Sequence, residues 1–375
     1  MRSLLLPLLL LATAFGQSGP RIQTSHTTEN LRGVSIVSAK IAWASGAHGT
    51  YLRTINGGET WIPGQVPDAT ALDFRAVVAF SADEAYLMSA GPGEQSRIYH
   101  TNDAGQLWDL KFTNSNPKGF FDSMTFWDSK HGIVLGDPVP DEKGKLHFEI
   151  LQTDDGQSWH PIPASRLPEA VEGEGAFAAS NSCIAILHTP SGDSNIWFAT
   201  GGKVSRVFHS PDLGKTWEAF NTPILHGPES AGIFSISLRD ALHGVIAGGD
   251  YKHPDDDGPN LAFTEDGGKT WSLSTLKPQA FFSAVAYDQQ VNAAAIRLQK
   301  EQQPPNTLGR KLGAPIPPQR LFIVGEDFVF DFRPPNNPRR INGKKKEGFA
   351  FNAVTAYPEG GALVVGPKGT VAHIP

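Results

Sequence analysis

The chain has 375 residues, of which 39% are hydrophobic and 10% aromatic, so it carries enough apolar side chains for a large buried core. Its net charge of −6 at pH 7 is mild and argues against a general nucleic-acid-binding protein. A single cysteine, Cys183, excludes an intramolecular disulfide and a cysteine-based metal site, and the 39 glycines and 29 prolines favour many tight turns.

The N-terminal segment has the layout of a secretory signal peptide. Met1-Arg-Ser is followed by an apolar run from Leu4 to Phe15 and by small residues suited to cleavage near Gly16. This run is shorter than the roughly 18 residues of a membrane-spanning helix. The alternative is an ordinary apolar N-terminal strand, which four consecutive leucines before a polar segment fit poorly. We therefore expect residues 1–16 to be removed and the mature chain to be secreted or periplasmic and not membrane-spanning.

An eight-residue pattern occurs five times along the rest of the chain. Each copy has a hydroxyl or amide side chain, then Asp or Asn two residues later, Gly four residues later and Trp seven residues later. Asp accepts hydrogen bonds from nearby N–H groups in turns, Gly permits a positive φ, and Trp packs between sheets. We therefore interpret the copies as structural turns and not as acids or bases. They begin at Thr54, Thr101, Gln152, Ser210 and Thr264, and the acidic or amide residues are Asn56, Asp103, Asp154, Asp212 and Asp266.

The spacing of the copies predicts the architecture. Their first residues are 47 to 58 positions apart, with a mean of 52.5, and short apolar runs separated by turn residues lie between them. Such a period suits a four-stranded blade better than a helical repeat unit. We therefore expect residues 17–375 to form a single all-β domain, a seven-bladed β-propeller.

Seven similar segments are predicted to open the innermost strand of each blade. They have an apolar residue, a variable residue and then an alternating strand, and they begin near residues 31, 74, 121, 177, 234, 282 and 351. The sixth blade lacks the eight-residue pattern, because its apolar run Phe328–Phe332 leads into a proline-rich stretch. The seventh blade lacks an outermost strand, and we expect residues 21–25 from the N-terminus to pair with residues 369–374 and close the ring.

The eight-residue pattern resembles the Asp-box (BNR) repeat of sialidases, sortilin-type receptors and photosystem II stability/assembly-factor propellers. Other segments, such as Gly136-Asp-Pro138 and Gly248-Gly-Asp-Tyr251, are similar to bacterial exported proteins of the assembly-factor-like group. The resemblance implies the fold, with the boxes on the rim. It is weak for a sialidase, because Arg21-Ile-Gln23 lacks the proline of the expected Arg-Ile-Pro motif and that family has six blades.

Aligning the seven innermost strands brings their variable residues to the mouth of one central channel. Arg32, Arg75 and Asp122 would form a polar, mainly cationic rim that could clamp a carboxylate or an acidic peptide end. The alternative is that they simply solvate a wet channel. Glu174 and Asp250 are expected in the same region. The complete column is Arg32, Arg75, Asp122, Ala178, Ser235, Ser283 and Asn352.

Two functions from different classes fit this rim. The first is a protein-binding or assembly module that recognises an exported or membrane-protein segment. The alternative is a glycan-active enzyme, a glycosyl hydrolase or sialidase-like protein, using carboxylates such as Glu174, Asp122 or Asp250 at the channel mouth. No nucleotide-binding loop, nucleophile elbow or zinc motif occurs, and no cofactor is predicted. A close carboxylate pair in a deep pocket would favour the enzyme, and a broad arginine-rich rim the binder.

Three further segments are interpreted as solvated. Asp255-Asp-Asp-Gly258 could offer oxygen ligands to Ca²⁺, but its spacing is not that of an EF-hand loop. The polar stretch 299–311 is expected to be an insertion in the sixth blade, and 339–346 a basic turn. The twelve histidines show no metal-ligand spacing.

Overall fold

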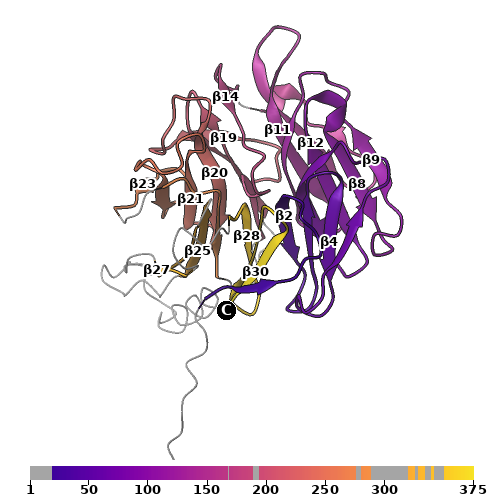
Figure 1. Cartoon of the computed structure of the whole chain (residues 1–375). Helices are drawn as coiled ribbons and strands as arrows, with labels where there is room; N and C mark the ends of the chain where they lie inside the picture. Colours follow the sequence, from indigo (N-terminus) through magenta and orange to yellow (C-terminus); the bar gives the residue numbers. More distant parts are fainter. Residues whose placement is uncertain are drawn as a thin grey trace, which may run out of the picture.

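A computed structural model of the chain describes residues 19–167, 169–188, 194–275, 280–288, 320–325, 328–333, 339–341 and 350–375. The predicted signal peptide (1–16) and insertion (299–311) lie outside these residues, as does most of the basic segment 339–346. Almost all of the regular secondary structure in the described chain is β-strand, and the strands form seven sheets arranged around a central axis (Figure 1). The fold is a seven-bladed β-propeller, as the spacing of the repeats predicts.

The chain builds the blades in order, each from its innermost strand outwards. Blades one to three are β2 (Leu31–Ile36), β3 (Ala42–Gly46), β4 (Thr50–Thr54) and β5 (Ile62–Gln65); β6 (Asp73–Ala79), β7 (Ala85–Ala90), β8 (Arg97–Thr101) and β9 (Asp109–Thr113); and β10 (Phe121–Phe126), β11 (Gly132–Pro140), β12 (Leu146–Thr153) and β13 (His160–Pro161). Two short 3-10 helices, η1 (Gly93–Gln95) and η2 (Ala164–Arg166), lie between strands.

Blades four to seven follow the same plan. They are β15 (Ile184–His188), β16 (Ser194–Ala199), β18 (Arg206–Ser210) and β19 (Glu218–Asn221); β20 (Ala231–Leu238), β21 (Gly244–Asp250), β22 (Leu261–Thr264) and β23 (Ser272–Leu273); β24 (Ala284–Tyr287), β25 (Leu321–Gly325), β26 (Phe328–Phe332) and β27 (Arg339–Arg340); and β28 (Ala353–Ala356), β29 (Ala362–Gly366), β30 (Thr370–Ile374) and β1 (Arg21–Gln23).

The core lies between neighbouring blades. Each of the seven interfaces holds its own apolar cluster, and the cluster between blades seven and one joins Leu31 and Leu52 to Leu363 and Val365. Side chains on both faces of central strands such as β7 and β29 are therefore buried along the whole strand, and these strands do not alternate between buried and exposed residues.

The N-terminal strand closes the ring, as predicted. β1 pairs antiparallel with β30, with Arg21 opposite His373 and Gln23 opposite Val371 (Figure 1, indigo beside yellow). Gln23 also reaches the first blade. Its Nε2 donates to the carbonyl of Gly57 at 3.0 Å, and its Oε1 accepts from Trp61 Nε1 at 2.9 Å. Closure therefore joins the last blade to the first through side chains as well as through the sheet.

The eight-residue repeats form the turns between the third and fourth strands of the first five blades. In the first copy, Thr54 Oγ1 accepts from the Gly58 N–H at 2.9 Å, and Asn56 Oδ1 accepts from the Thr60 N–H at 3.0 Å. The copies at Thr101, Ser210 and Thr264 repeat these bonds. These residues staple turns, as the pattern indicates.

The third copy differs from its prediction by one residue. Thr153 Oγ1, not Gln152, accepts from the Gly156 N–H at 2.9 Å. Asp155, not Asp154, accepts from the Ser158 N–H at 2.7 Å. This turn is one residue shorter than the others, so assigning Asp154 as its staple was wrong.

The fourth blade also departs from the alignment. Its innermost strand, β15, begins at Ile184, whereas the predicted start at Phe177 lies in an irregular segment, residues 176–182, which we call the strap. The strap contacts several blades around the channel. Asn181 Oδ1 accepts from the Met124 N–H at 2.7 Å, and Ser180 Oγ donates to the Ser283 carbonyl at 3.1 Å.

Two short strands, β14 (Glu174–Gly175) and β17 (Gly201–Gly202), attach the chain before the strap to the fifth blade. β17 pairs with β20 at Gly201 opposite Gly232. A Cβ on Gly201 would lie 2.6 Å from the Gly232 Cα and 2.4 Å from the Phe177 ring, so this close approach requires glycine. It places Phe177 at the channel mouth.

Candidate binding site at the channel mouth

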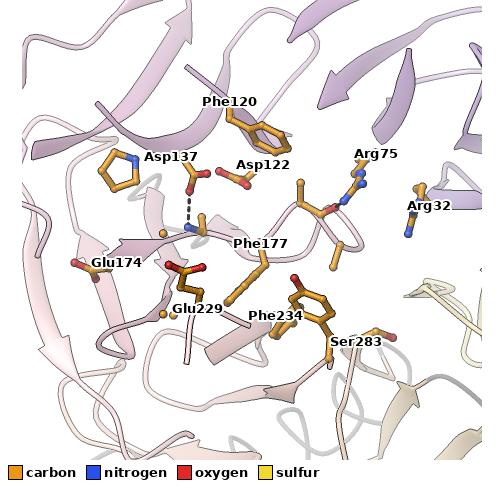
Figure 2. A pocket seen from close by; sticks show the side chains of 18 of the residues that line it. Arg32, Arg75, Phe120, Asp122, Asp137, Glu174, Phe177, Glu229, Phe234 and Ser283 are labelled. Carbon is orange, nitrogen blue, oxygen red and sulfur yellow. Dashed lines mark hydrogen bonds between the residues drawn. The ribbon is translucent and has the colours of Figure 1, made fainter. Parts of the chain in front are cut away.

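A cavity of about 790 Å³ opens at the channel mouth (Figure 2). Most of the residues predicted from the sequence border it, including Glu174, although Ser235 and Asp250 do not. The members of the predicted column that border it are Arg32, Arg75, Asp122, Ala178, Ser283 and Asn352.

β-Bulges place three of these residues at the cavity. The ladders of the first three blades skip Arg32, Arg75 and Asp122, so each is an extra residue opposite its neighbouring strand. A bulge bends the strand and re-aims the side chain. In the fifth blade the bulge falls on Phe234, one residue before the predicted Ser235. Phe234 therefore borders the cavity, and Ser235 is buried beneath the strap.

The two arginines share one carboxylate. Arg75 Nε donates to Asp73 Oδ2 at 2.9 Å, and Arg32 Nε lies 3.6 Å from the same oxygen. Arg75 Nη1 also donates to the strap carbonyl of Ala178 at 2.6 Å. Burial and the neighbouring Arg75 charge lower the pKa of Arg32, but a guanidinium stays protonated at neutral pH. Two cations facing one anion leave this side of the cavity positive.

A pair of carboxyl groups forms the opposite side. Asp122 is 1% exposed, and Asp137 occupies another bulge, on β11. Asp137 Oδ1 accepts from the strap N–H of Ala176 at 3.0 Å. Burial raises the pKa of Asp137 to about 6. Burial, followed by repulsion from Asp137, raises the pKa of Asp122 well above its usual range, although Arg75 and the Ala178 N–H oppose the shift.

Asp137 is a charged residue of the cavity that the aligned column of innermost strands does not contain. Its signal is the segment Gly136-Asp-Pro138, in which a proline follows an acidic residue inside a strand. Proline interrupts a ladder and marks a bulge, which is where this side chain turns into the cavity.

Glu174 is a structural ion-pair partner. Its side chain is fully buried and pairs with Arg206, whose Nε donates to Oε1 at 2.8 Å. Thr200 Oγ1 donates to the same oxygen at 2.7 Å, and the Val171 N–H donates to Oε2 at 2.9 Å. Both carboxylate oxygens are thus engaged away from the cavity.

Asp250 and Asn352 also have local partners. Asp250 Oδ1 accepts from the Lys252 N–H, and Oδ2 lies 2.9 Å from His253 Nδ1, so this carboxylate organises its own loop outside the cavity wall. Asn352 borders the cavity, and its Nδ2 donates to the Leu31 carbonyl at 2.7 Å, joining the seventh blade to the first. Neither residue adds charge to the site.

Aromatic rings form a further wall of the cavity beside the two charged sides. The rings of Phe177 and Phe234 stack with centroids 3.9 Å apart, and Phe281 meets Phe234 edge-on at 4.8 Å. Figure 2 shows Asp137 on one side of Phe177 and the arginines on the other. Tyr251, at 47% exposure, extends the wall towards solvent. The cavity therefore offers a basic side, an apolar wall and an acidic side.

Neither a metal centre nor a spanning helix is found in the described ranges. No group of three or more His, Cys, Asp or Glu side chains there, including those of the Asp255–Asp257 loop, is arranged to hold a metal ion. Among the same residues, no helix has the length and apolar character needed to cross a membrane.

Comparisons with known proteins identify the fold alone. No protein-family model matches the sequence, and no curated protein matches it. The solved structure of YCF48 bound to D1 peptide is similar, with 16% identity, a TM-score of 0.60, and 95% of this chain and 96% of that chain covered. The virginiamycin B lyase of Staphylococcus aureus, solved with quinupristin, is 11% identical, with a TM-score of 0.59 and coverage of 94% and 98%. The GH74 xyloglucanase of Xanthomonas campestris is 13% identical, with a TM-score of 0.56, and 94% of this chain covers 53% of it. A binding protein and two enzymes thus share this propeller architecture.

Proposed function

We propose that this protein is an exported peptide-binding module and that the channel-mouth cavity holds a segment of another exported or membrane protein. The observation that carries the proposal is the pair of arginines, Arg32 and Arg75, that share Asp73 beside a wall of aromatic rings. A carboxylate on the ligand would complete the pairing of the guanidinium groups, and an apolar side chain would cover the rings.

Three further observations support this proposal. The cavity volume falls within the roughly 300–1,000 Å³ typical of sites for compact ligands, which suits a few residues of peptide. A protein of the same fold has been solved with a bound peptide. The five turns resemble Asp-box repeats and the N-terminal segment resembles a signal peptide, and both fit an exported propeller of the assembly-factor-like kind.

The test is capture from a native membrane extract, followed by mass spectrometry and by affinity measurements on peptides from the captured protein. Arg32→Ala/Arg75→Ala should weaken peptide binding at least ~tenfold and flatten the salt dependence of the association rate, because two charge-assisted contacts are lost. Arg97→Ala/Arg166→Ala removes the same charge outside the cavity and should change neither quantity. Equal affinities for the wild type and both double variants would contradict the proposal.

The Asp122–Asp137 pair supports a second candidate, a glycan-active enzyme, because a general acid needs a raised pKa like that of Asp137. The burial of Asp122 weighs against it, since a carboxyl group that is 1% exposed cannot reach a sugar directly. This candidate predicts release of reducing ends from an oligosaccharide panel, abolished in Asp137→Asn. We favour the binding module.

A further inference from the structure

Binding of an anion by the two arginines gives no role to the acidic side of the cavity. Asp122 lies almost wholly buried at the cavity wall, and its Oδ2 has no hydrogen-bond partner within the part of the chain that the structure describes. Asp137 lies beside it, with Oδ1 held by the Ala176 N–H. Burying two neighbouring carboxyl groups costs free energy unless a cation or donor compensates them.

The charged groups around this pair do not supply that compensation. Arg75 attracts Asp122 but already pairs with Asp73 and Ala178. The Cys183 thiol near Asp122 is buried, and burial raises its pKa, so it stays neutral. Glu229 and Lys118 also border the cavity, and Glu174 is neutralised by its own arginine. Since Glu229 and Lys118 carry opposite charges, they leave Asp122 and Asp137 without a counter-charge of their own.

We propose that Asp122 and Asp137 form an acidic subsite that binds an ammonium or guanidinium group of the peptide. The cation would pair with the carboxylate of Asp137 that faces the cavity, while Asp122 behind it adds a second negative charge. The inference rests on the proposed function, because the same cavity must hold the peptide. It defines the ligand as a segment with an acidic group for the arginines, an apolar side chain for the rings and a basic group for this pair.

An organic cation fits better than a metal ion. Ca²⁺ requires six to eight oxygen ligands, and this site offers two carboxyl groups, each with a hydrogen bond from a backbone N–H. Ammonium and guanidinium groups need only one or two carboxylates, and they accept the asymmetric geometry of a single wall.

Binding should be linked to proton release. In the free protein the pair retains a proton near neutral pH, because burial raises the pKa of both groups and repulsion from Asp137 raises that of Asp122 further. A bound cation favours the ionised form, so the proton leaves to solvent as the ligand binds. Affinity for a basic peptide should therefore rise with pH between about 5 and 7.5.

The test uses fluorescent peptides in which glycine spacers of varied length separate one acidic, one Phe and one basic position. The acidic position is Glu or Gln, and the basic position is Lys or norleucine, which removes the charge with little change of shape. Affinities are measured for the wild type, Asp137→Asn, Asp122→Asn and the control Asp109→Asn, which removes a charge on the outer strand β9. Calorimetry in two buffers of different ionisation enthalpy counts the protons released.

We expect the change from Lys to norleucine to weaken binding to the wild type about tenfold and to have little effect on binding to Asp137→Asn. Asp109→Asn should behave as wild type, and Asp122→Asn should release fewer protons than the wild type, because only Asp137 is then left to ionise. Peptides that bind through Arg32 and Arg75 but do not distinguish Lys from norleucine would overturn the acidic subsite and leave the proposed function standing. If no peptide in the panel binds the wild type, both the acidic subsite and the proposed function are wrong.

Discussion

Ring closure can be tested at a single side chain, Gln23. Its amide lies against Gly58, where an added Cβ would come within 2.2 Å of it, and it bonds both Gly57 and Trp61. In Gln23→Ala, water can replace the bond to the partly exposed Gly57. The indole N–H of Trp61 would lose its partner, and because Trp61 is 2% exposed, water cannot readily replace it. An unsatisfied buried donor costs about 1–3 kcal/mol, so we expect the free energy of unfolding to fall by about 2 kcal/mol.

The measurement is urea unfolding followed by tryptophan fluorescence. Gln65→Ala is the matched control, because Gln65 Nε2 donates to the His48 carbonyl on the exposed surface of the first blade, and its loss should cost less than about 0.5 kcal/mol. Trp61→Phe removes the indole N–H, so the loss on Gln23→Ala should shrink in that background. If Gln23→Ala is no less stable than Gln65→Ala, the side-chain contribution to closure is refuted.

Three further predictions concern the turns and the acidic pair. Trp217→Ala removes a 9%-exposed ring that packs on Phe198, and it should cost on the order of 3–5 kcal/mol in urea unfolding; a loss below about 1 kcal/mol would contradict this packing. Asp155→Ala should lower the melting temperature and Asp154→Ala should not, whereas the reverse order would restore the sequence-based assignment. Because Asp137 has a pKa raised to about 6, the folded protein binds more protons than the unfolded chain between about pH 4 and 6, so stability should fall as pH rises through that window. Asp137→Asn should reduce that slope, and an unchanged slope in unfolding measured at several pH values would refute the assignment.

The repeats made the fold predictable because each turn depends on local chemistry. A hydroxyl, an Asp or Asn, a Gly and a Trp at set spacing form the same staple wherever they occur, so the spacing of the five copies gives the length of one blade, and the length of the chain then gives seven. The seventh blade lacks an outermost strand of its own, and this predicted pairing with the N-terminal strand, since an open sheet edge needs a partner. The prediction for the third copy was wrong because its turn is one residue shorter and is held by Asp155.

The site was predicted less completely, because it depends on bulges and on long-range contacts. Arg32, Arg75 and Asp122 were placed together because their blades carry the bulge at the same position of the pattern. The pattern Ile233-Phe-Ser235 can be aligned in two ways, and only the ladder shows that Phe234 is the bulged residue. Asp137 is the bulged residue of another strand, β11, which lies outside the aligned column.

The strap has a consequence for how rigidly the cavity is built. One residue of it, Ala178, donates its N–H to the carboxyl group of Asp122 and accepts at its carbonyl from Arg75. The two peptide units that meet at the Cα of Ala178 therefore link the acidic and basic sides, and this one residue works as a spacer between them. A ligand that pulls on one side must move the other, so the cavity should select ligands by the distance between their opposite charges as much as by the charges themselves.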